Sequence, residues 1–427
     1  MKNAQYFPAI LLFVLLAVLA AACNQDAIFY IISREVAPLK PRIEGAPTAM
    51  AVFEREYTFG GAPVSVPVMY VASSRLHWYA RPKTDYDPAA PAVSMPKWDS
   101  ADYRLSQPGG KIISLAVTPD YLYVLSISGS GTAMTLKRTG KHENDVWETV
   151  AVEPKDYAKI QTIYAASGRL FAGAGTADAR SFAILYMDEN GASPQLKMMV
   201  KTDSYLLTGA AYDGTSYYLT TSGKGVYMTA ESSLASAAPA PVQLGDTADV
   251  NAARDKNFQG IIEIPNGAVP PQIVAVERSG MLYDVTAAGF TEIQNLLDSS
   301  AKKTTGALAV YGDINGKMLL AGTRYDTSGT TTAGYTNGYI ELNYSAGGIL
   351  DSTSERHEPG KPVSGTSLTT VGDHDRYAAT LGKHSINHLF QVPAEVDSEK
   401  TLFAATQTAG LWSYRNRADG WQWNAEE

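Results

Sequence analysis

The chain has 427 residues, with 35 lysines and arginines against 43 aspartates and glutamates, a formal net charge of −8 and a single cysteine. This acidic balance, with no basic run longer than two residues, argues against nucleic acid as a partner, because binding to phosphates requires clustered Lys and Arg. One cysteine also excludes a scaffold held together by disulfides.

The first segment of the chain is apolar. Residues 9–22, AILLFVLLAVLAAA, contain no polar side chain, and Lys2 precedes them with a positive charge. This run is shorter than the roughly 20 residues that a membrane-spanning helix needs. It has the length of a signal-peptide core followed by small residues at a cleavage site. We therefore predict that residues 1–22 are a signal peptide.

Cys23 follows this segment directly, after Leu19 and three alanines. The pattern resembles a bacterial lipobox, although the usual leucine three places before the cysteine is replaced here by Ala20. The resemblance to bacterial lipoproteins implies a covalent lipid on Cys23, and several acyl chains anchor a protein stably. It implies a location in the cell envelope, at the outer face of the inner membrane or at the outer membrane. No other cofactor is predicted.

Residues 23–45 are predicted to form the lipidated N-terminus and a tether to the domain that follows. Prolines occur at positions 38 and 41, as expected of an extended linker. The apolar, β-branched segment at residues 28–32 is atypical of a spacer. We expect it to add a strand to the domain.

Residues 46–427 are rich in short apolar strands separated by turn signals such as DG, NG and SG. Seven segments share a hairpin pattern, and their aligned anchor positions are Tyr70, Tyr123, Phe171, Tyr218, Val274, Leu320 and Phe403. The successive spacings are 53, 48, 47, 56, 46 and 83 residues. Five of the six lie at or slightly above the period of about 40–50 residues that is typical of propeller blades.

A further strand precedes each hairpin, and another follows most of them, for example DVWETVAVE at residues 145–153. The preceding strands read TAMAVFE, ISLAVTPD, IQTIYAAS, LTGAAYDG, QGIIEIPN, GALAVYGD and INHLFQVP. Five of the seven contain alanine, as expected where innermost strands converge on an axis. Four strands per repeated unit predict an all-β fold, a single β-propeller of seven four-stranded blades.

The 83-residue spacing indicates an insertion at about residues 321–387. An alternative is a degenerate eighth blade, of which SLTTVGDHDRYAATLG would be the remnant. A pair of β-sandwiches is the other fold that this strand pattern allows.

Two of the hairpins, AATQTAGLWSY and LTTSGKGVYM, resemble the propeller repeats of bacterial sensor proteins. This resemblance is limited to the hairpins. It implies a fold and no function.

Candidate metal ligands cluster near the predicted insertion. They are His374, His384 and His388 together with Asp373 and Asp375. Imidazole and carboxylate groups together bind Zn²⁺ or a similar ion. The alternative interpretation is a solvated polar loop, and we predict no metal.

Aromatic residues supply the other candidate site. Tyr325 and Tyr335 fall in a Ser/Thr/Gly-rich loop and are candidate ligand contacts. Most other tyrosines and tryptophans occupy strand positions, for which Tyr is well suited. No motif for nucleophilic catalysis occurs in the sequence.

Together these features predict a lipid-anchored, non-catalytic binding or assembly module at a membrane surface, with a protein partner in the cell envelope. The alternative is an exported enzyme that acts on glycan or cell-wall material, with residues 352–388 at its site.

Overall fold

The structure is a computed structural model. It describes residues 43, 46–87, 94–99, 105–129, 133–188, 194–234, 239–245, 255–266, 269–297, 302–313, 316–325, 338–345, 348–357, 381, 384–417 and 420–426.

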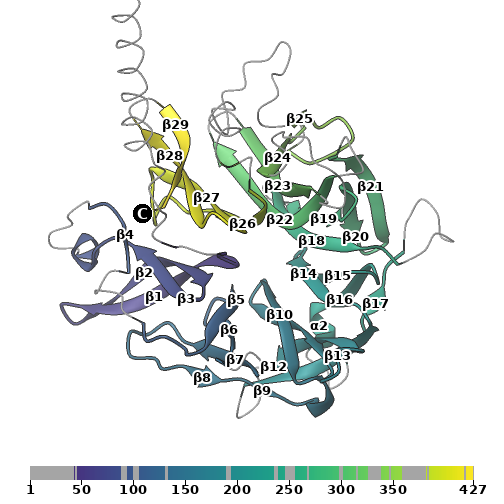
Figure 1. Cartoon of the computed structure of the whole chain (residues 1–427), viewed down its shortest axis with the longest axis horizontal. Coiled ribbons are helices and arrows are strands. Elements are labelled where there is room, and N and C mark those ends of the chain that lie inside the picture. Colours follow the sequence, from purple (N-terminus) through teal and green to yellow (C-terminus); the bar gives the residue numbers. More distant parts are fainter. Residues whose placement is uncertain are drawn as a thin grey trace, which may run out of the picture.

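The described residues form seven β-sheets arranged around an axis (Figure 1). The strands of the first three sheets are β1 (Ala49–Phe59), β2 (Ala62–Ser73), β3 (Arg75–Ala80), β4 (Lys97–Trp98), β5 (Lys111–Val117), β6 (Leu122–Ile127), β7 (Met134–Thr139), β8 (Glu148–Thr149), β9 (Ala151–Val152), β10 (Lys159–Ala166), β11 (Arg169–Gly175), β12 (Phe182–Asp188) and β13 (Gln195–Asp203). Those of the next two are β14 (Leu207–Tyr212), β15 (Ser216–Thr221), β16 (Val226–Ala230), β17 (Val242–Gln243), β18 (Phe258–Asn266), β19 (Val269–Glu277), β20 (Met281–Thr286) and β21 (Gly289–Asn295). Those of the last two are β22 (Lys302–Asp313), β23 (Gly316–Tyr325), β24 (Gly338–Asn343), β25 (Arg356–His357), β26 (Ile386–Gln391), β27 (Lys400–Thr406), β28 (Leu411–Arg417) and β29 (Gly420–Ala425).

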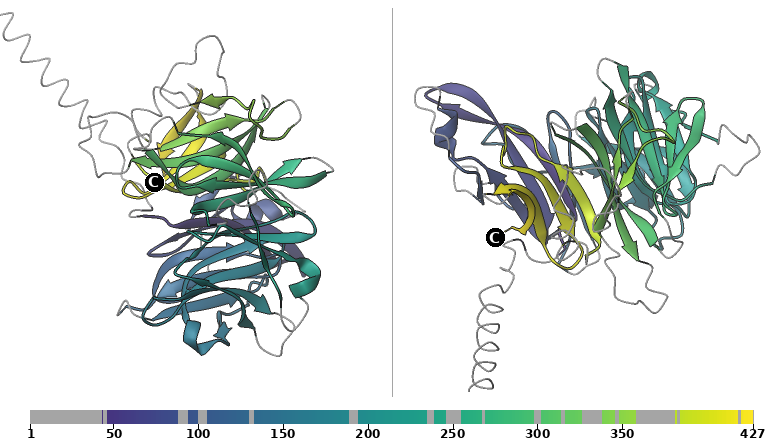
Figure 2. Two further views of the ribbon diagram at one scale, coloured as in Figure 1. Left: turned by 90° about the vertical axis from the view of Figure 1, so that its right-hand side faces the viewer. Right: turned by 90° about the horizontal axis from the view of Figure 1, so that it is seen from above.

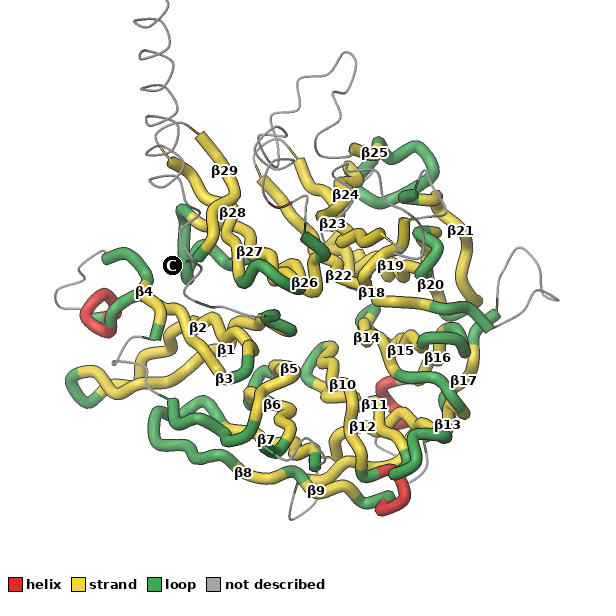
Figure 3. The backbone as a smooth tube through the Cα atoms, in the orientation of Figure 1, coloured by secondary structure: helices red, strands yellow, loops and turns green. Residues whose placement is uncertain are grey.

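Helices are short in the described part of the chain, and the strands and loops dominate it (Figure 3). They are the 3₁₀ turns η1 (Lys83–Tyr86) and η3 (Lys155–Tyr157) and the single turn α2 (Glu231–Leu234). Figure 2 shows the same sheets from two further directions.

The predicted seven-bladed β-propeller is confirmed. Within each sheet the four strands of a blade follow one another in chain order and pair antiparallel. The innermost strands are β1, β5, β10, β14, β18, β22 and β26 (Figure 1). They coincide with the seven preceding strands that the sequence identified.

The seven hairpin anchors occupy the same place in every blade. Each lies on the second strand of its sheet, and each has a relative exposure of 0%. In four blades the residue opposite the anchor on the innermost strand is alanine, as in the Ala51–Tyr70 and Ala211–Tyr218 pairs. A small residue near the axis therefore accommodates a large one further out.

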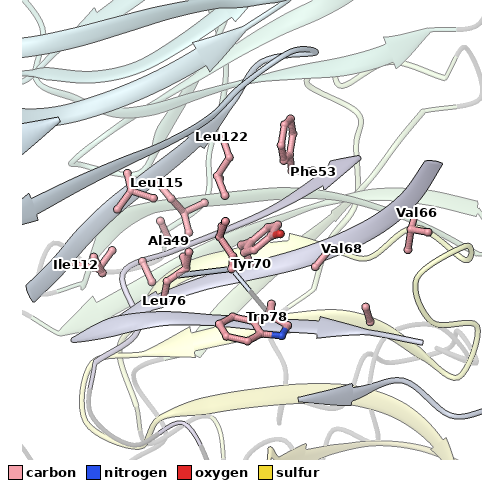
Figure 4. Packing of buried hydrophobic residues seen from close by; sticks show 14 of the residues in the cluster. Ala49, Phe53, Val66, Val68, Tyr70, Leu76, Trp78, Ile112, Leu115 and Leu122 are labelled. Atoms are coloured by element: carbon pink, nitrogen blue, oxygen red, sulfur yellow. The ribbon is translucent and has the colours of Figure 1, made fainter. Parts of the chain in front are cut away.

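The core consists of seven separate hydrophobic clusters, one between each pair of adjacent blades. Figure 4 shows the cluster between the first two blades, in which Phe53 and Tyr70 of the first blade lie near Leu115 and Leu122 of the second. Because one cluster also joins the seventh blade to the first, the ring is closed.

The innermost strands of the fifth and sixth blades approach closely at two glycines. A Cβ atom on Gly260 would lie 2.7 Å from the carbonyl oxygen of Gly306. Gly306 itself has a φ of +80°, a conformation that residues with side chains rarely adopt. These two positions therefore require glycine.

Among the described residues, no strand is shared between the first and last blades, since all four described strands of the seventh sheet come from residues 386–425. Side chains make the junction instead. Ile43 has an exposure of 1% and packs in the closing cluster. The Tyr79 hydroxyl donates to Asp397 at 2.7 Å, and the Trp98 indole donates to Glu426 at 2.8 Å. Residues 28–32, predicted to add a strand, lie outside the described residues.

One expected strand is divided between two blades. The sequence predicted a single fourth strand over residues 145–153, but β8 pairs with β7 of the second blade, whereas β9 pairs in parallel with β13 of the third. Within the interval 321–387, β24 and β25 belong to the sixth sheet. Residues 358–380, which include most of the possible eighth-blade remnant, lie outside the described residues.

Candidate functional site

The structure describes only part of the sites predicted from the sequence. Cys23, Tyr335, Asp373, His374 and Asp375 all lie outside the described residues. Tyr325 is the last residue of β23.

The two described histidines among the candidate metal ligands have different surroundings. His384 Nδ1 lies 3.2 Å from the Thr408 hydroxyl. His388 stands on β26, 6.4 Å from the Phe390 ring between centroids. Burial lowers the pKa of His388 to about 4, so its imidazole is neutral at physiological pH, and its Nδ1 has no hydrogen-bond partner among the described residues. Within the part of the chain that the structure covers, no group of three or more His, Cys, Asp or Glu could hold a metal.

A cleft of about 1070 Å³ lies where the second blade meets the third. We call it the lysine cleft, after three of its lining residues. It is lined by Ala133, Met134, Lys155, Asp156, Tyr157, Ala158, Lys159, Thr176, Ala177, Asp178 and Lys201. Sequence reasoning did not identify it.

Local structure places the lysines around the cleft. Pro154 precedes the 3₁₀ turn η3, and its carbonyl accepts a hydrogen bond from the Tyr157 amide at 2.8 Å. Tyr157 is buried in the cluster between the second and third blades, so it fixes the turn to the core. Lys155 and Lys159 stand on either side of this anchor, and Lys201 comes from the end of β13.

The three ammonium groups of the cleft form no ion pair or hydrogen bond with described residues. Lys201 Nζ lies 5.9 Å from the centroid of the Tyr157 ring, within the range of a cation–π contact. Several lysines elsewhere are paired, for example Lys197 with Asp188 at 2.6 Å. The cleft is therefore a site of unbalanced positive charge on an acidic protein.

The two acidic residues of the cleft offset only part of the charge of its three lysines. Asp178 accepts a hydrogen bond from the Thr176 hydroxyl at 2.6 Å, which lowers the pKa of this carboxyl, and it lies 3.6 Å from Arg180. Asp156 is exposed and has no partner among the described residues. Open access and unpaired cations suit this surface to binding carboxylate, phosphate or sulfate groups.

A second cavity, of about 530 Å³, differs in its charge balance. Here the Arg138 guanidinium stacks 3.9 Å from the Tyr121 ring centroid and pairs with Glu148 at 3.2 Å. Lys141 pairs with Asp120 at 3.5 Å. Because these charges are matched, this cavity offers less to an anionic ligand than the lysine cleft does.

Comparison with known proteins gives no family for this chain. No protein-family model matches it, and no curated protein is similar to it. Among solved structures, it is similar to the extracellular domain of a protein described as a hybrid two-component system from B. thetaiotaomicron, with 12% identity, a TM-score of 0.45, and coverage of 89% of this chain and 39% of the other. A dihydro-heme d1 dehydrogenase shows 10% identity and a TM-score of 0.45, over 91% of this chain and 76% of its own. Puromycin hydrolase shows 11% identity and a TM-score of 0.41, over 86% of this chain and 52% of its own. The chain thus spans well under half the length of the first of these, and the assignment as a propeller rests on its own sheet topology.

Proposed function

We propose that this protein is an exported lipoprotein, anchored through Cys23, whose propeller acts as a non-catalytic binding or assembly module at a membrane surface. The observation that carries the binding role is the lysine cleft, with its three unpaired ammonium groups. The partner is a component of the cell envelope that presents acidic groups to this cleft.

The tether limits where that partner can lie. Ile43 is held in the closing cluster, and it lies 20 positions after Cys23 in the sequence. A fully extended chain of this length spans at most about 70 Å. The partner must therefore lie within this distance, plus the width of the ring, from the membrane surface. Among the described residues, no helix has both the length and the apolar character to cross a membrane.

The test is cross-linking in native membranes, followed by mass spectrometry of the captured material. We expect an acidic envelope partner with the native chain, and loss of that partner with Cys23→Ser, which removes the anchor. Substitution of Lys155, Lys159 and Lys201 by Gln is expected to abolish capture while leaving the protein in the membrane fraction.

A matched variant removes the same charge from lysines that are already paired, namely Lys141, Lys197 and Lys224, each substituted by Gln. Exposed pairs of this kind contribute little to stability, so capture should persist. Equal capture by both triple variants would show that the lysine cleft does not bind the partner. Capture of glycan without protein would support the alternative of an exported glycan-active enzyme.

A further inference from the structure

A smaller cavity, of about 330 Å³, lies at the boundary where the ring closes. We call it the closure cavity. It is lined by Tyr79, Pro96, Lys97, Trp98, Lys400, Arg415, Ala425 and Glu426. The first four come from the first blade and the last four from the seventh, so the cavity spans two blades that share no strand in the part of the chain that the structure describes.

Aromatic rings form one wall of the closure cavity. The Tyr79 and Trp98 rings are 4.7 Å apart between centroids, and both pack edge-on against Phe403 at 6.0 and 6.3 Å. All three residues are buried in the closing cluster. The wall is therefore rigid and apolar, suited to the carbon body of a small ligand.

The polar groups of the closure cavity leave an excess of positive charge. Lys400 is balanced, because its ammonium pairs with Glu426 at 2.8 Å and lies 4.8 Å from the Tyr79 ring centroid. Glu426 also accepts hydrogen bonds from the Trp98 indole and the Ser413 hydroxyl, so its carboxylate is occupied.

Two cations remain. The side chain of Arg415 makes no hydrogen bond or ion pair with described residues, and its buried Nε has no acceptor. Lys97 is exposed and likewise unpaired within the described residues. A buried donor without an acceptor costs free energy that a bound acceptor would recover.

We propose that the closure cavity binds a small organic anion, whose carboxylate or phosphate group is held by Arg415 and Lys97 and whose carbon body lies along the Tyr79–Trp98 wall. The guanidinium offers a planar fork of donors that matches either anionic group. Because the ligand touches the first and seventh blades at once, its binding stabilises the closed ring through linkage.

The experiment is isothermal titration calorimetry of the full chain at low ionic strength, with inorganic phosphate, acetate and benzoate as separate probes. The comparison of phosphate with acetate distinguishes the two anionic groups, and that of benzoate with acetate measures the contribution of the aromatic wall. We expect saturable binding of at least one probe, at least ten-fold weaker binding by Arg415→Gln, and a rise in melting temperature with the same probe.

Lys111→Gln is the matched control, because Lys111 is exposed and lies outside the cavity. The Lys111→Gln chain should bind the probe with the same affinity as the native chain. This result separates binding at the closure cavity from general charge effects. Lys97→Gln repeats the test at an exposed position if Arg415→Gln fails to fold. The absence of saturable binding, or equal affinity in the native, Arg415→Gln and Lys97→Gln chains, would overturn the proposal.

Discussion

A buried carboxylate in the sixth blade makes the stability of the ring depend on pH. Glu341 lies on β24 with an exposure of 1%, and one of its carboxylate oxygens has no hydrogen-bond partner among the described residues. Burial raises the pKa of this carboxyl to about 8, and a hydrogen bond with Tyr339 offsets part of the effect. Glu341 is therefore largely protonated at neutral pH in the folded protein, whereas the unfolded chain releases the proton at its ordinary pKa.

The direction and size of this pH dependence follow from the linkage between proton binding and folding. The folded state holds the proton more tightly, so the stability contribution is fully present below the ordinary pKa of 4.5 and is lost as pH rises through 8. Each unit of pKa difference corresponds to about 1.4 kcal/mol. Relative to low pH, where the carboxyl is protonated in both states, the free energy of unfolding is therefore lower by roughly 3 kcal/mol at pH 7 and by roughly 5 kcal/mol above pH 9. Glu341→Gln removes this dependence because the amide does not titrate in this range.

The assay is urea unfolding followed by tryptophan fluorescence, for the native chain and Glu341→Gln, from pH 6 to 9.5. We expect the difference in unfolding free energy to grow with pH in favour of the variant and to level off above pH 9. Groups common to both chains cancel in this difference. Glu395→Gln, at an exposed glutamate, should follow the native chain throughout. Parallel profiles for the native chain and Glu341→Gln would show that the carboxyl titrates normally and refute the reasoning.

Three further substitutions or titrations test the ring. Glu426→Ala should destabilise it by about 3–5 kcal/mol, because the buried ammonium that Glu426 pairs with loses its partner; the denaturation midpoint measures this, and exposed Glu399→Ala is the control. Gly260→Ala should cost at least about 2 kcal/mol, since its Cβ would meet a backbone carbonyl; Gly129→Ala, with open space around the new methyl group, should cost far less in the same assay. The His388 imidazole, with its pKa lowered by burial, should stay neutral down to about pH 5 in an NMR titration, and protonation near pH 6.5 would contradict its burial.

The fold was largely predictable because its determinants are local and repeated. Anchors such as Tyr123 and Phe171 recur at a spacing close to the blade period, and Ala116 precedes Tyr123 on the strand closer to the axis. Each blade thus carries its own pattern of alternation and turn residues, which the sequence displays directly. The division of residues 145–153 between two sheets was missed, because an uninterrupted β-like segment gives no sign of where its partner changes.

The candidate binding site was less predictable because it is assembled from distant residues. Lys155 and Lys201 are 46 positions apart, and the sequence has no basic run between them that would mark a cationic surface. The closure cavity brings together Trp98 and Glu426 across most of the chain. Unpaired charge is a property of three-dimensional neighbours, so neither site leaves a signature in composition or spacing.

Because side chains join the first and seventh blades, the distance between the two ends of the described chain reports whether the ring is closed. Ile43 and Glu426, close to the two ends of the described chain, are both buried at that one boundary. In a ring sealed by a shared strand, the ends could stay together while the blades separate. Here the two ends separate when the blades do. A pair of spectroscopic labels near residues 43 and 426 therefore detects opening of the ring without any further label on the blades.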